Sequence, residues 1–212
     1  MEIHTPDAPL HSFRDFVVHL VMISLGVLIA LGAEGLVEHV HNRHVVAEAR
    51  ANLISEMREN KAALEDNLPK LKKNEELLAE ALTDMKKLRA DRKYKPPDIN
   101  LNLGFFSLSD TSWRTAEATG ALALMQYQEA KDFAGYYDVQ VMLNRLLNSL
   151  EDTWLDMTAA FNPIGGGDLS KMDDRQLDEV QRRVQLALGR LVAVENVARA
   201  LDKFYNQKLN QK

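Results

Sequence analysis

The residues best suited to metal or proton chemistry lie in segment 34–44, which reads EGLVEHVHNRH. Three of the six histidines of the chain fall in this segment, the other three precede it, and none follows it. Because each residue of a helix turns by about 100°, one face of a helix here would carry Glu34, Glu38, His41, His44 and Glu48. Histidine and carboxylate groups on neighbouring turns can bind a divalent metal or titrate near neutral pH.

A single copy of the chain cannot complete a ferritin-like two-metal site at this segment. Such a site needs two Glu-x-x-His motifs and two further carboxylates, and only Glu38-x-x-His41 lies outside the apolar part of the chain. Three interpretations therefore stay open. The cluster is a polar collar beside a membrane, a pH-sensitive contact between two copies, or a divalent-metal site of His41, His44 and Glu48 shared across a dimer.

The composition removes several kinds of chemistry. The chain has no cysteine, which excludes disulfides, thiol catalysis and cysteine-ligated metals. Without a histidine after His44, the long C-terminal part cannot build a Ser-His-Asp system. We therefore predict no catalytic residues and no cofactor, and an enzyme would require a buried pair of carboxylates. The net charge is −5 and no long basic run occurs, which argues against nucleic acid as a partner.

The elements that position the histidines begin with an apolar run from Phe16 to Ala33. These 18 residues would span about 27 Å as a helix, close to the thickness of a bilayer core of about 30 Å. A cleaved signal peptide is the alternative, but the run is long for one and the helical pattern continues beyond it. We expect a tail at 1–15, a transmembrane anchor at 16–36 and a helical bundle domain at 37–212.

Small residues on the anchor favour contact between two copies. Gly26, Ala30 and Ala33 fall on the same helical face as His41 and His44, and small-xxx-small spacing lets membrane helices approach closely. A homo-oligomer joined through the anchor is therefore predicted. The few flanking charges, with Arg14 before the run and Arg43 and Arg50 after it, lean toward a cytoplasmic bundle.

After the anchor, seven-residue repeats predict three long helical segments. The first repeat carries Met57, Leu64, Leu71, Leu78 and Met85, and it keeps its phase across Pro69, so Pro69 is expected to kink one helix rather than end it. A second helix is expected at 128–161, with Tyr136 among its inward residues. The third carries Leu177, Val184, Leu191, Ala198 and Tyr205, with Asp173 and Gln176 as a capping pair. The fold class is all-α: a transmembrane helix that continues into an antiparallel bundle of three long segments plus a short helix.

Two loops and a short helix separate these segments. Composition predicts loops near 93–110 and 162–173, and the alternation from Ile99 to Phe105 allows a short strand in the first. The short helix is expected at 112–125. In it, Ala116 and Gly120 are spaced to let another helix come close, and Trp113 would plug the end of the bundle or line a pocket.

Two stretches resemble a known group of proteins. The anchor with Phe13 or Phe16, Gly26 and Ala30-Leu31, followed downstream by Trp113 and Thr119-Gly120-Ala121-Leu122, is similar to a group of uncharacterised bacterial single-pass membrane proteins. Asp15 replaces the usual glutamate, the usual juxtamembrane tryptophan is missing, and the resemblance covers about half of the chain. It implies a bacterial inner-membrane protein whose bundle lies in the periplasm, against the charge count. The group has no assigned activity to carry over.

The sequence as a whole therefore favours a membrane-anchored helical interaction or sensory module. We expect it to associate with itself and to contact an envelope protein or a small ligand. A pH- or metal-responsive regulator that uses His41, His44 and Glu48 across a dimer is the alternative. An enzyme with carboxylate chemistry is a third reading.

Overall fold

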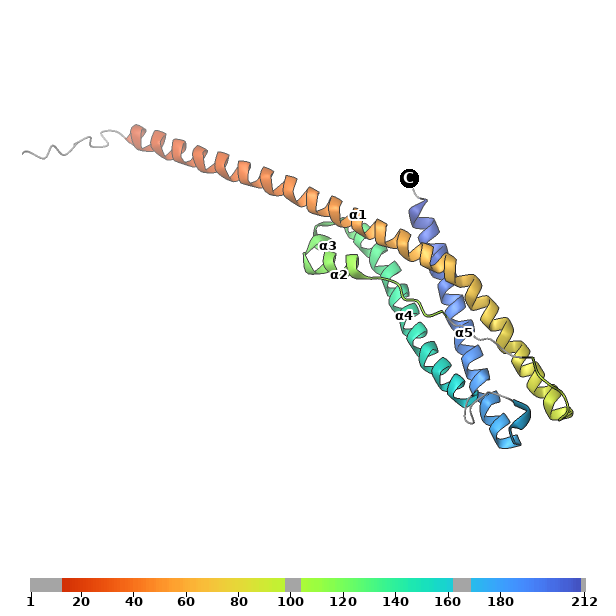
Figure 1. Cartoon of the computed structure of the whole chain (residues 1–212). Helices are drawn as coiled ribbons and strands as arrows, with labels where there is room; N and C mark the ends of the chain where they lie inside the picture. Colours follow the sequence, from red (N-terminus) through yellow and green to blue (C-terminus); the bar gives the residue numbers. More distant parts are fainter. Residues whose placement is uncertain (1–12, 98–103, 162–168, 211–212) are drawn as a thin grey trace, which may run out of the picture. The chain divides into compact units, whose positions relative to one another are not determined.

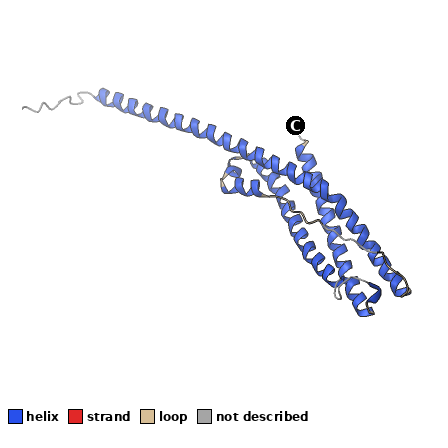
Figure 2. Cartoon of the chain, viewed as in Figure 1, coloured by secondary structure: helices blue, strands red, loops and turns tan. Residues whose placement is uncertain are grey.

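The computed structural model describes residues 13–97, 104–161 and 169–210, and these residues form helices and loops without a strand (Figures 1 and 2). The predicted all-α class is confirmed. The elements are α1 (Phe13–Ala90), α2 (Thr111–Ala118), α3 (Ala121–Leu124), α4 (Tyr127–Phe161), the 3₁₀ turn η1 (Leu169–Lys171) and α5 (Asp174–Leu209). The chain divides into two compact units, Met1–Glu48 and Ala49–Lys212, which are described separately below.

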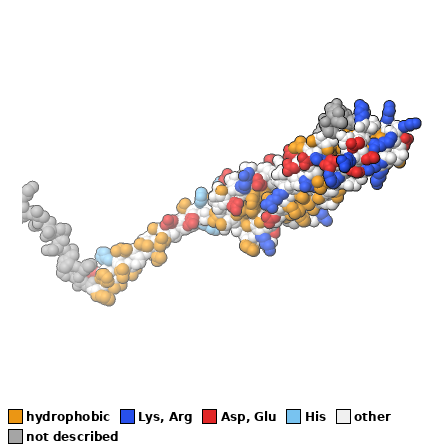
Figure 3. Space-filling view, turned by 90° about the horizontal axis from the view of Figure 1, so that it is seen from below, with side chains coloured by type: hydrophobic (Ala, Val, Ile, Leu, Met, Phe, Trp, Pro, Cys, Tyr) orange, Lys and Arg blue, Asp and Glu red, His pale blue; other side chains and the backbone are white. Residues whose placement is uncertain are grey.

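The first unit contains the apolar part of α1. An 18-residue window there has the length and composition of a membrane span, and none of it is buried. Hydrophobic side chains cover this part of the helix with few charges among them (Figure 3). Leu20, Leu25 and Leu31 are each more than half exposed. A helix that is apolar all round suits a lipid environment, so the coarse prediction of a helix able to cross a membrane is confirmed.

In the second unit, α1 buries the predicted heptad positions. The side chains of Met57, Leu64, Leu78 and Met85 are fully buried and Leu71 nearly so. Helix α1 passes through Pro69 without ending, as predicted. Apart from Glu56 and Asp84, the other buried residues of α1 form one row that lies three residues after these positions, because seven-residue spacing places two rows side by side. This row contains Leu53, Asn60, Asn67, Asn74, Ala81 and Leu88.

Helices α4 and α5 complete the core. Every predicted inward residue of α5 is buried, and Asp173 with Gln176 forms a full capping box at its start. In α4 the heptad row of Tyr136 faces the core as predicted, since Leu143, Leu150 and Met157 are buried. At the start of the helix, however, Tyr137 is buried and Tyr136 only half-buried, because the second inward row is that of Phe133, Gln140 and Leu147. The prediction that counted Tyr136 as the inward tyrosine is therefore wrong.

Contacts between the helices establish their directions. Arg50 pairs with Glu129, Glu56 with Tyr137 and Asn60 with Gln140, so α1 and α4 run parallel. Arg89 near the end of α1 pairs with Asp178 near the start of α5, so these two helices are antiparallel. The backbone of Ser149 near the middle of α4 accepts a bond from Arg190, and that of Asp156 accepts one from Arg183, so α4 and α5 are antiparallel as well.

A long connection makes the parallel pair of helices achievable. Next to the end of α1, Arg92 donates to the carbonyl of Met172 at 3.0 Å. At the other end of the connection, the amide of Ser109 donates to Asn60, thirty residues before the end of α1. The chain therefore returns along the bundle before α2 begins. Residues 99–103 of the predicted strand-like stretch lie outside the described part, and Gly104–Asp110 have no regular secondary structure.

The predicted short helix at 112–125 is two helices. It is interrupted because Gly120 has φ +74°, a left-handed conformation that strains residues with a side chain. A methyl group placed at Gly120 would meet nothing within 4 Å. Gly120 is therefore needed for a sharp turn between α2 and α3, and the prediction that it sits within a helix to make room for a neighbour is wrong.

A buried polar network as candidate functional site

The least expected site in the second unit is the buried carboxylate of Glu56 on α1. Its side chain accepts hydrogen bonds from the hydroxyl of Tyr137 at 2.7 Å, from the hydroxyl of Ser109 at 2.9 Å and from the backbone amide of Ser112 at 2.8 Å. Only 5 % of Glu56 is exposed. A buried carboxylate is costly unless donors surround it, and three donors from three parts of the chain meet that need here.

The bond from Ser112 makes Glu56 the cap of α2. Helix α2 starts at Thr111 after the N-cap residue Asp110, whose side chain makes no capping bond. The first amides of a helix lack partners within the helix, and its start favours a negative charge. Glu56 supplies both from a different helix. The predicted start of the short helix near residue 112 is confirmed within one residue, whereas the group that satisfies this start could not be found from local sequence.

Asn60, one turn further along α1, extends the network toward α4 and α5. Its side chain donates to the carbonyl of Ser109 at 2.8 Å and accepts from the amide of Ser109 at 2.9 Å. Gln140 on α4 donates to the same carbonyl at 2.6 Å and accepts from the hydroxyl of Tyr205 on α5 at 2.6 Å. One residue of the connection is thus held by side chains of the long helices.

The same device repeats at Leu108. Its amide donates to Asn144 at 3.1 Å and its carbonyl accepts from Asn144 at 2.9 Å. Buried backbone groups must find partners, and residues 108 and 109 find theirs in side-chain amides rather than in a sheet. The two asparagines and Gln140 therefore anchor the connection between α1 and α4.

The two tyrosines of the network remain protonated donors. Burial, and then the hydrogen bond to Glu56, raise the pKa of the Tyr137 hydroxyl far above its usual range. Burial likewise raises the pKa of the Tyr205 hydroxyl. Neither hydroxyl can serve as a base near neutral pH. Both act as fixed hydrogen-bond donors to Glu56 and Gln140.

The network also positions Trp113. Its ring stacks on that of Tyr137, with ring centroids 5.0 Å apart and an angle of 25° between the planes. Trp113 itself is half-buried, and it covers a tyrosine that is 3 % exposed. The predicted role of Trp113 as a bundle plug or a pocket residue stays a prediction. Ala116, one turn later in α2, is buried, and its predicted role in close helix packing stays a prediction.

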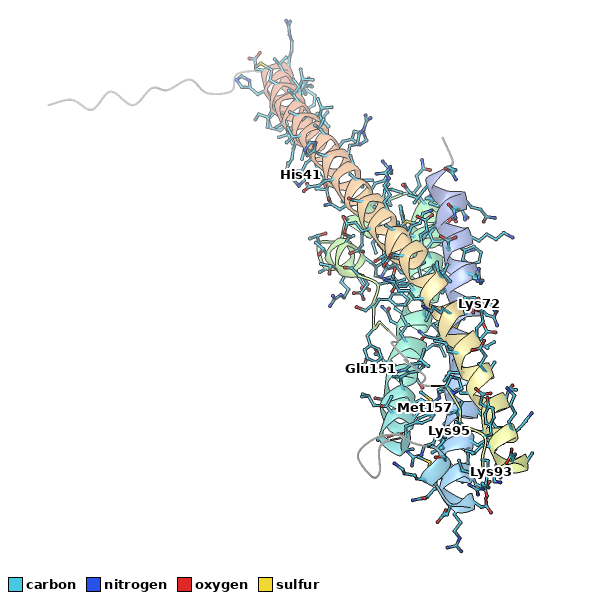
Figure 4. All side chains as sticks on the ribbon, turned by 45° about the vertical axis from the view of Figure 1, so that its right-hand side comes forward. His41, Lys72, Lys93, Lys95, Glu151 and Met157 are labelled. Atoms are coloured by element: carbon cyan, nitrogen blue, oxygen red, sulfur yellow. The ribbon has the colours of Figure 1, made fainter. Side chains whose placement is uncertain are left out.

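The histidine cluster lies in the first unit. His41, His44 and Glu48 are all exposed on α1, and the side chain of His41 projects away from the helix (Figure 4). Among the described residues, no group of three histidine, aspartate or glutamate side chains converges as metal ligands would. The metal prediction, which required a second copy, stays a prediction.

The small residues of the anchor are also exposed. A methyl group at Gly26 would meet nothing within 4 Å, and Ala30 and Ala33 are open in the same way. Their predicted role in packing two anchors together stays a prediction.

Other buried carboxylates of the second unit have structural partners. Asp84 accepts from Lys87 at 2.8 Å and from the hydroxyl of Tyr94 at 2.7 Å, which together lower the pKa of the Asp84 carboxyl. Glu195 accepts from Arg199 at 2.6 and 2.8 Å through one oxygen. Asp84 is therefore satisfied by its two donors. The second oxygen of Glu195, Oε2, is buried without a donor among the described residues, and the neighbouring Glu195 carboxyl lowers the pKa of the Glu75 carboxyl.

The sequence contains a signal for part of this network that the prediction missed. Asn60, Asn67 and Asn74 recur every seven residues, in the row beside the apolar heptad positions. A polar residue at such a position usually specifies partner and register at some cost in stability. Glu56 and Gln140 give no such signal, because their burial depends on a connection that returns from far along the chain.

In comparisons with known proteins, no family model, no curated protein and no solved structure matches the chain. Fold and network alone define its class. It is an all-helical bundle protein with one N-terminal segment that could cross a membrane.

Proposed function

We propose that the protein is a single-pass, membrane-anchored helical module that binds other proteins or senses a ligand outside the cytoplasm. The observation that carries the proposal is the contrast along α1. One stretch of this helix is apolar on every side and unburied, whereas the next is sorted into a buried stripe and a polar face. A helix of this kind suits a module fixed to a bilayer by one end.

The proposed setting is the bacterial inner membrane with the bundle in the periplasm, as the resemblance to single-pass bacterial proteins suggests. An interaction role fits a bundle whose buried polar groups largely satisfy one another and whose tyrosines are held as donors. The partners we propose are a second copy of the chain and an envelope protein.

Location and orientation are testable with one introduced cysteine, because the chain has none of its own. Tyr127→Cys changes a residue that is 81 % exposed in the second unit. We expect a membrane-impermeant maleimide to label this variant in intact spheroplasts and the protein to resist extraction by alkaline carbonate. Labelling only after lysis would place the bundle in the cytoplasm. Extraction by carbonate would show that the chain has no transmembrane anchor.

Binding is testable by capture of the full-length protein from detergent-solubilised membranes. We expect an envelope protein to co-purify with the wild-type chain and to be reduced with Trp113→Ala, which removes the half-buried ring beside the network. Equal capture of the envelope protein by the wild type and by Trp113→Ala would show that Trp113 is not part of the binding surface. Absence of any specific partner would contradict the interaction role.

The pH- or metal-responsive regulator is kept as a second proposal because His41, His44 and Glu48 are all exposed on one stretch of helix. A histidine loses its charge near pH 6.5, so two facing clusters would repel one another in acid. The test is His41→Ala with His44→Ala in the full chain. Unchanged self-association from pH 5 to pH 8, with no zinc retained by either protein, would rule out both forms of this proposal.

A further inference from the structure

The outer side of the α4–α5 pair carries apolar residues that the described part of the chain leaves uncovered. Met142 on α4 and Leu186 and Phe204 on α5 are 47 %, 52 % and 38 % exposed. At about 100° per residue they lie on the side of each helix away from α1. Half-buried Leu146 and Val197 continue the surface between them. We call this surface the outer α4–α5 face.

Gly189 gives this face room for a close neighbour. It lies in the interior of α5, where glycine weakens a helix relative to alanine. A methyl group there would meet nothing within 4 Å, so nothing in the described part of the chain requires a glycine. Ala193 and Ala200 follow it on the same side of α5. A helix from outside the chain could therefore approach the backbone of α5 closely.

Charged residues at the two ends of the outer α4–α5 face indicate which kind of molecule binds it. At one end, Asp138 on α4 and Lys203 on α5 lie two residues to either side of the Gln140–Tyr205 hydrogen bond, so these two charges are within about 6 Å of one another in height, a difference that a lysine side chain can span. At the other end, Arg183 donates to the carbonyl of Asp156, which sets the adjacent Arg182 level with Asp156. Each end thus has an acid on α4 and a base on α5.

We infer that the outer α4–α5 face binds the same face of a second copy of this chain, about a two-fold axis parallel to the helices. Rotation about this axis places α5 of one copy over α4 of its partner. Each residue keeps its position along the direction of the helices. Lys203 of one copy then lies opposite Asp138 of the other, and Arg182 opposite Asp156. Arg145, between the acids on α4, comes level with the uncharged Asn196. Met142, Leu186 and Phe204 are covered in the middle.

This inference deepens the self-association proposed above by naming a surface in the bundle, independent of the anchor. Within the chain, Arg182 pairs with Glu179 on its own helix, and the ion pairs among the described residues include neither Asp138 nor Lys203. Both groups are exposed, so a partner in a second copy is compatible with the contacts of the first.

A charge exchange in the full chain, reconstituted in detergent or nanodiscs, tests the pairing. We expect Asp138→Lys and Lys203→Asp each to raise the dimer dissociation constant by about tenfold, because each places two like-charged pairs in one dimer. The double variant should return to within about threefold of the wild type. No rescue by the double variant would overturn the parallel arrangement. A dimer about an axis across the helices would instead place Lys203 opposite Arg182 and Asp138 opposite Asp156, so there each single exchange would strengthen dimerisation.

Gly189→Leu tests the close approach. Leucine favours helix, so the bundle should fold at least as well, while dimerisation falls by at least about tenfold. Ala62→Leu, at an exposed position of α1, is the matched control and should leave dimerisation unchanged. Equal dimerisation of both variants would overturn the inference.

Gly26→Leu distinguishes dimerisation through the anchor from dimerisation through the bundle. It adds a large side chain to the open side of the anchor helix. A dimer that survives Gly26→Leu and is lost with Gly189→Leu supports the bundle face. A dimer lost with Gly26→Leu and kept with Gly189→Leu overturns this inference and leaves self-association through the anchor standing.

Discussion

Leucines in the two units of the chain differ in how much of their side chain is exposed. Leu25, Leu28 and Leu31 of the first unit are 56 %, 65 % and 58 % exposed, whereas Leu64 of the second unit is fully buried, although all four belong to α1. The difference is one of pattern rather than of residue type. Leucines that surround a helix need an apolar solvent, and leucines repeated every seven residues need a partner helix.

The largest expected effect tests the core of the second unit. Phe133→Ala removes a fully buried ring of α4 and should lower the free energy of unfolding by about 3–5 kcal/mol, because a cavity adds to the lost burial. Urea unfolding of the full chain, followed by circular dichroism, measures it. Tyr127→Ala, at a residue that is 81 % exposed, is the control and should stay within about 0.5 kcal/mol. Equal effects would show that the core is loosely packed.

The next effect tests the environment of the first unit. Leu28→Arg places a charge in the middle of the apolar run and should disfavour membrane insertion by about 2.5–3.5 kcal/mol. The fraction of protein in sedimented membranes should fall, while the bundle keeps its unfolding transition. Val40→Arg lies beyond the run and should leave the membrane fraction unchanged. Full membrane retention of Leu28→Arg would argue against a spanning helix.

A smaller effect compares the polar network with the apolar core. Tyr137→Phe removes one donor from the buried Glu56 carboxylate and should destabilise the bundle by about 1–3 kcal/mol. Tyr136→Phe, at the half-buried neighbouring position, should change stability by less than about 0.5 kcal/mol. Urea denaturation of both variants distinguishes the two tyrosines. If Tyr136→Phe were the more damaging, the assigned phase of α4 would be wrong.

Two glycines of the second unit should respond with opposite signs. Gly120→Ala forces a side chain into a left-handed conformation and should cost about 1 kcal/mol. Gly135→Ala lies within α4 in open space and should stabilise the bundle by about 0.5–1 kcal/mol. Thermal unfolding of the two variants measures both. A stabilising Gly120→Ala would mean that α2 and α3 are one helix after all.

The smallest effect is electrostatic. Arg50 donates to Glu129 at 2.8 Å and lowers the pKa of the Glu129 carboxyl. Because that pKa is lowered by folding, the pair stabilises at neutral pH and its contribution is lost as the pH falls through the lowered value. Glu129→Gln should cost about 0.2–1 kcal/mol at pH 7 and nothing in strong acid. Denaturation at several pH values measures the difference. An equal cost at every pH would assign it to packing instead of charge.

Much of the helical framework follows from local patterns. The rows of α5, the capping pair Asp173–Gln176 and the passage of α1 through Pro69 all depend on residues within a few turns of one another. The polar network is different. Glu56 meets Ser109 and Tyr137, which are 53 and 81 residues away, and no local periodicity records these separations. The burial of Gln140 in α4 was missed for the same reason, since Gln140 is polar and its partner Tyr205 lies 65 residues away.

By itself, the sequence determined that this chain is helical, that its N-terminal part is apolar enough to cross a membrane and that three heptad patterns must share a core. Periodicity and hydrophobicity are local properties, and they suffice for those conclusions. Only the tertiary structure decided that α1 and α4 run parallel, that Glu56 caps α2 and that Gly120 turns the chain. These depend on which distant segments meet, and buried polar groups decide that by finding their partners wherever the fold brings them.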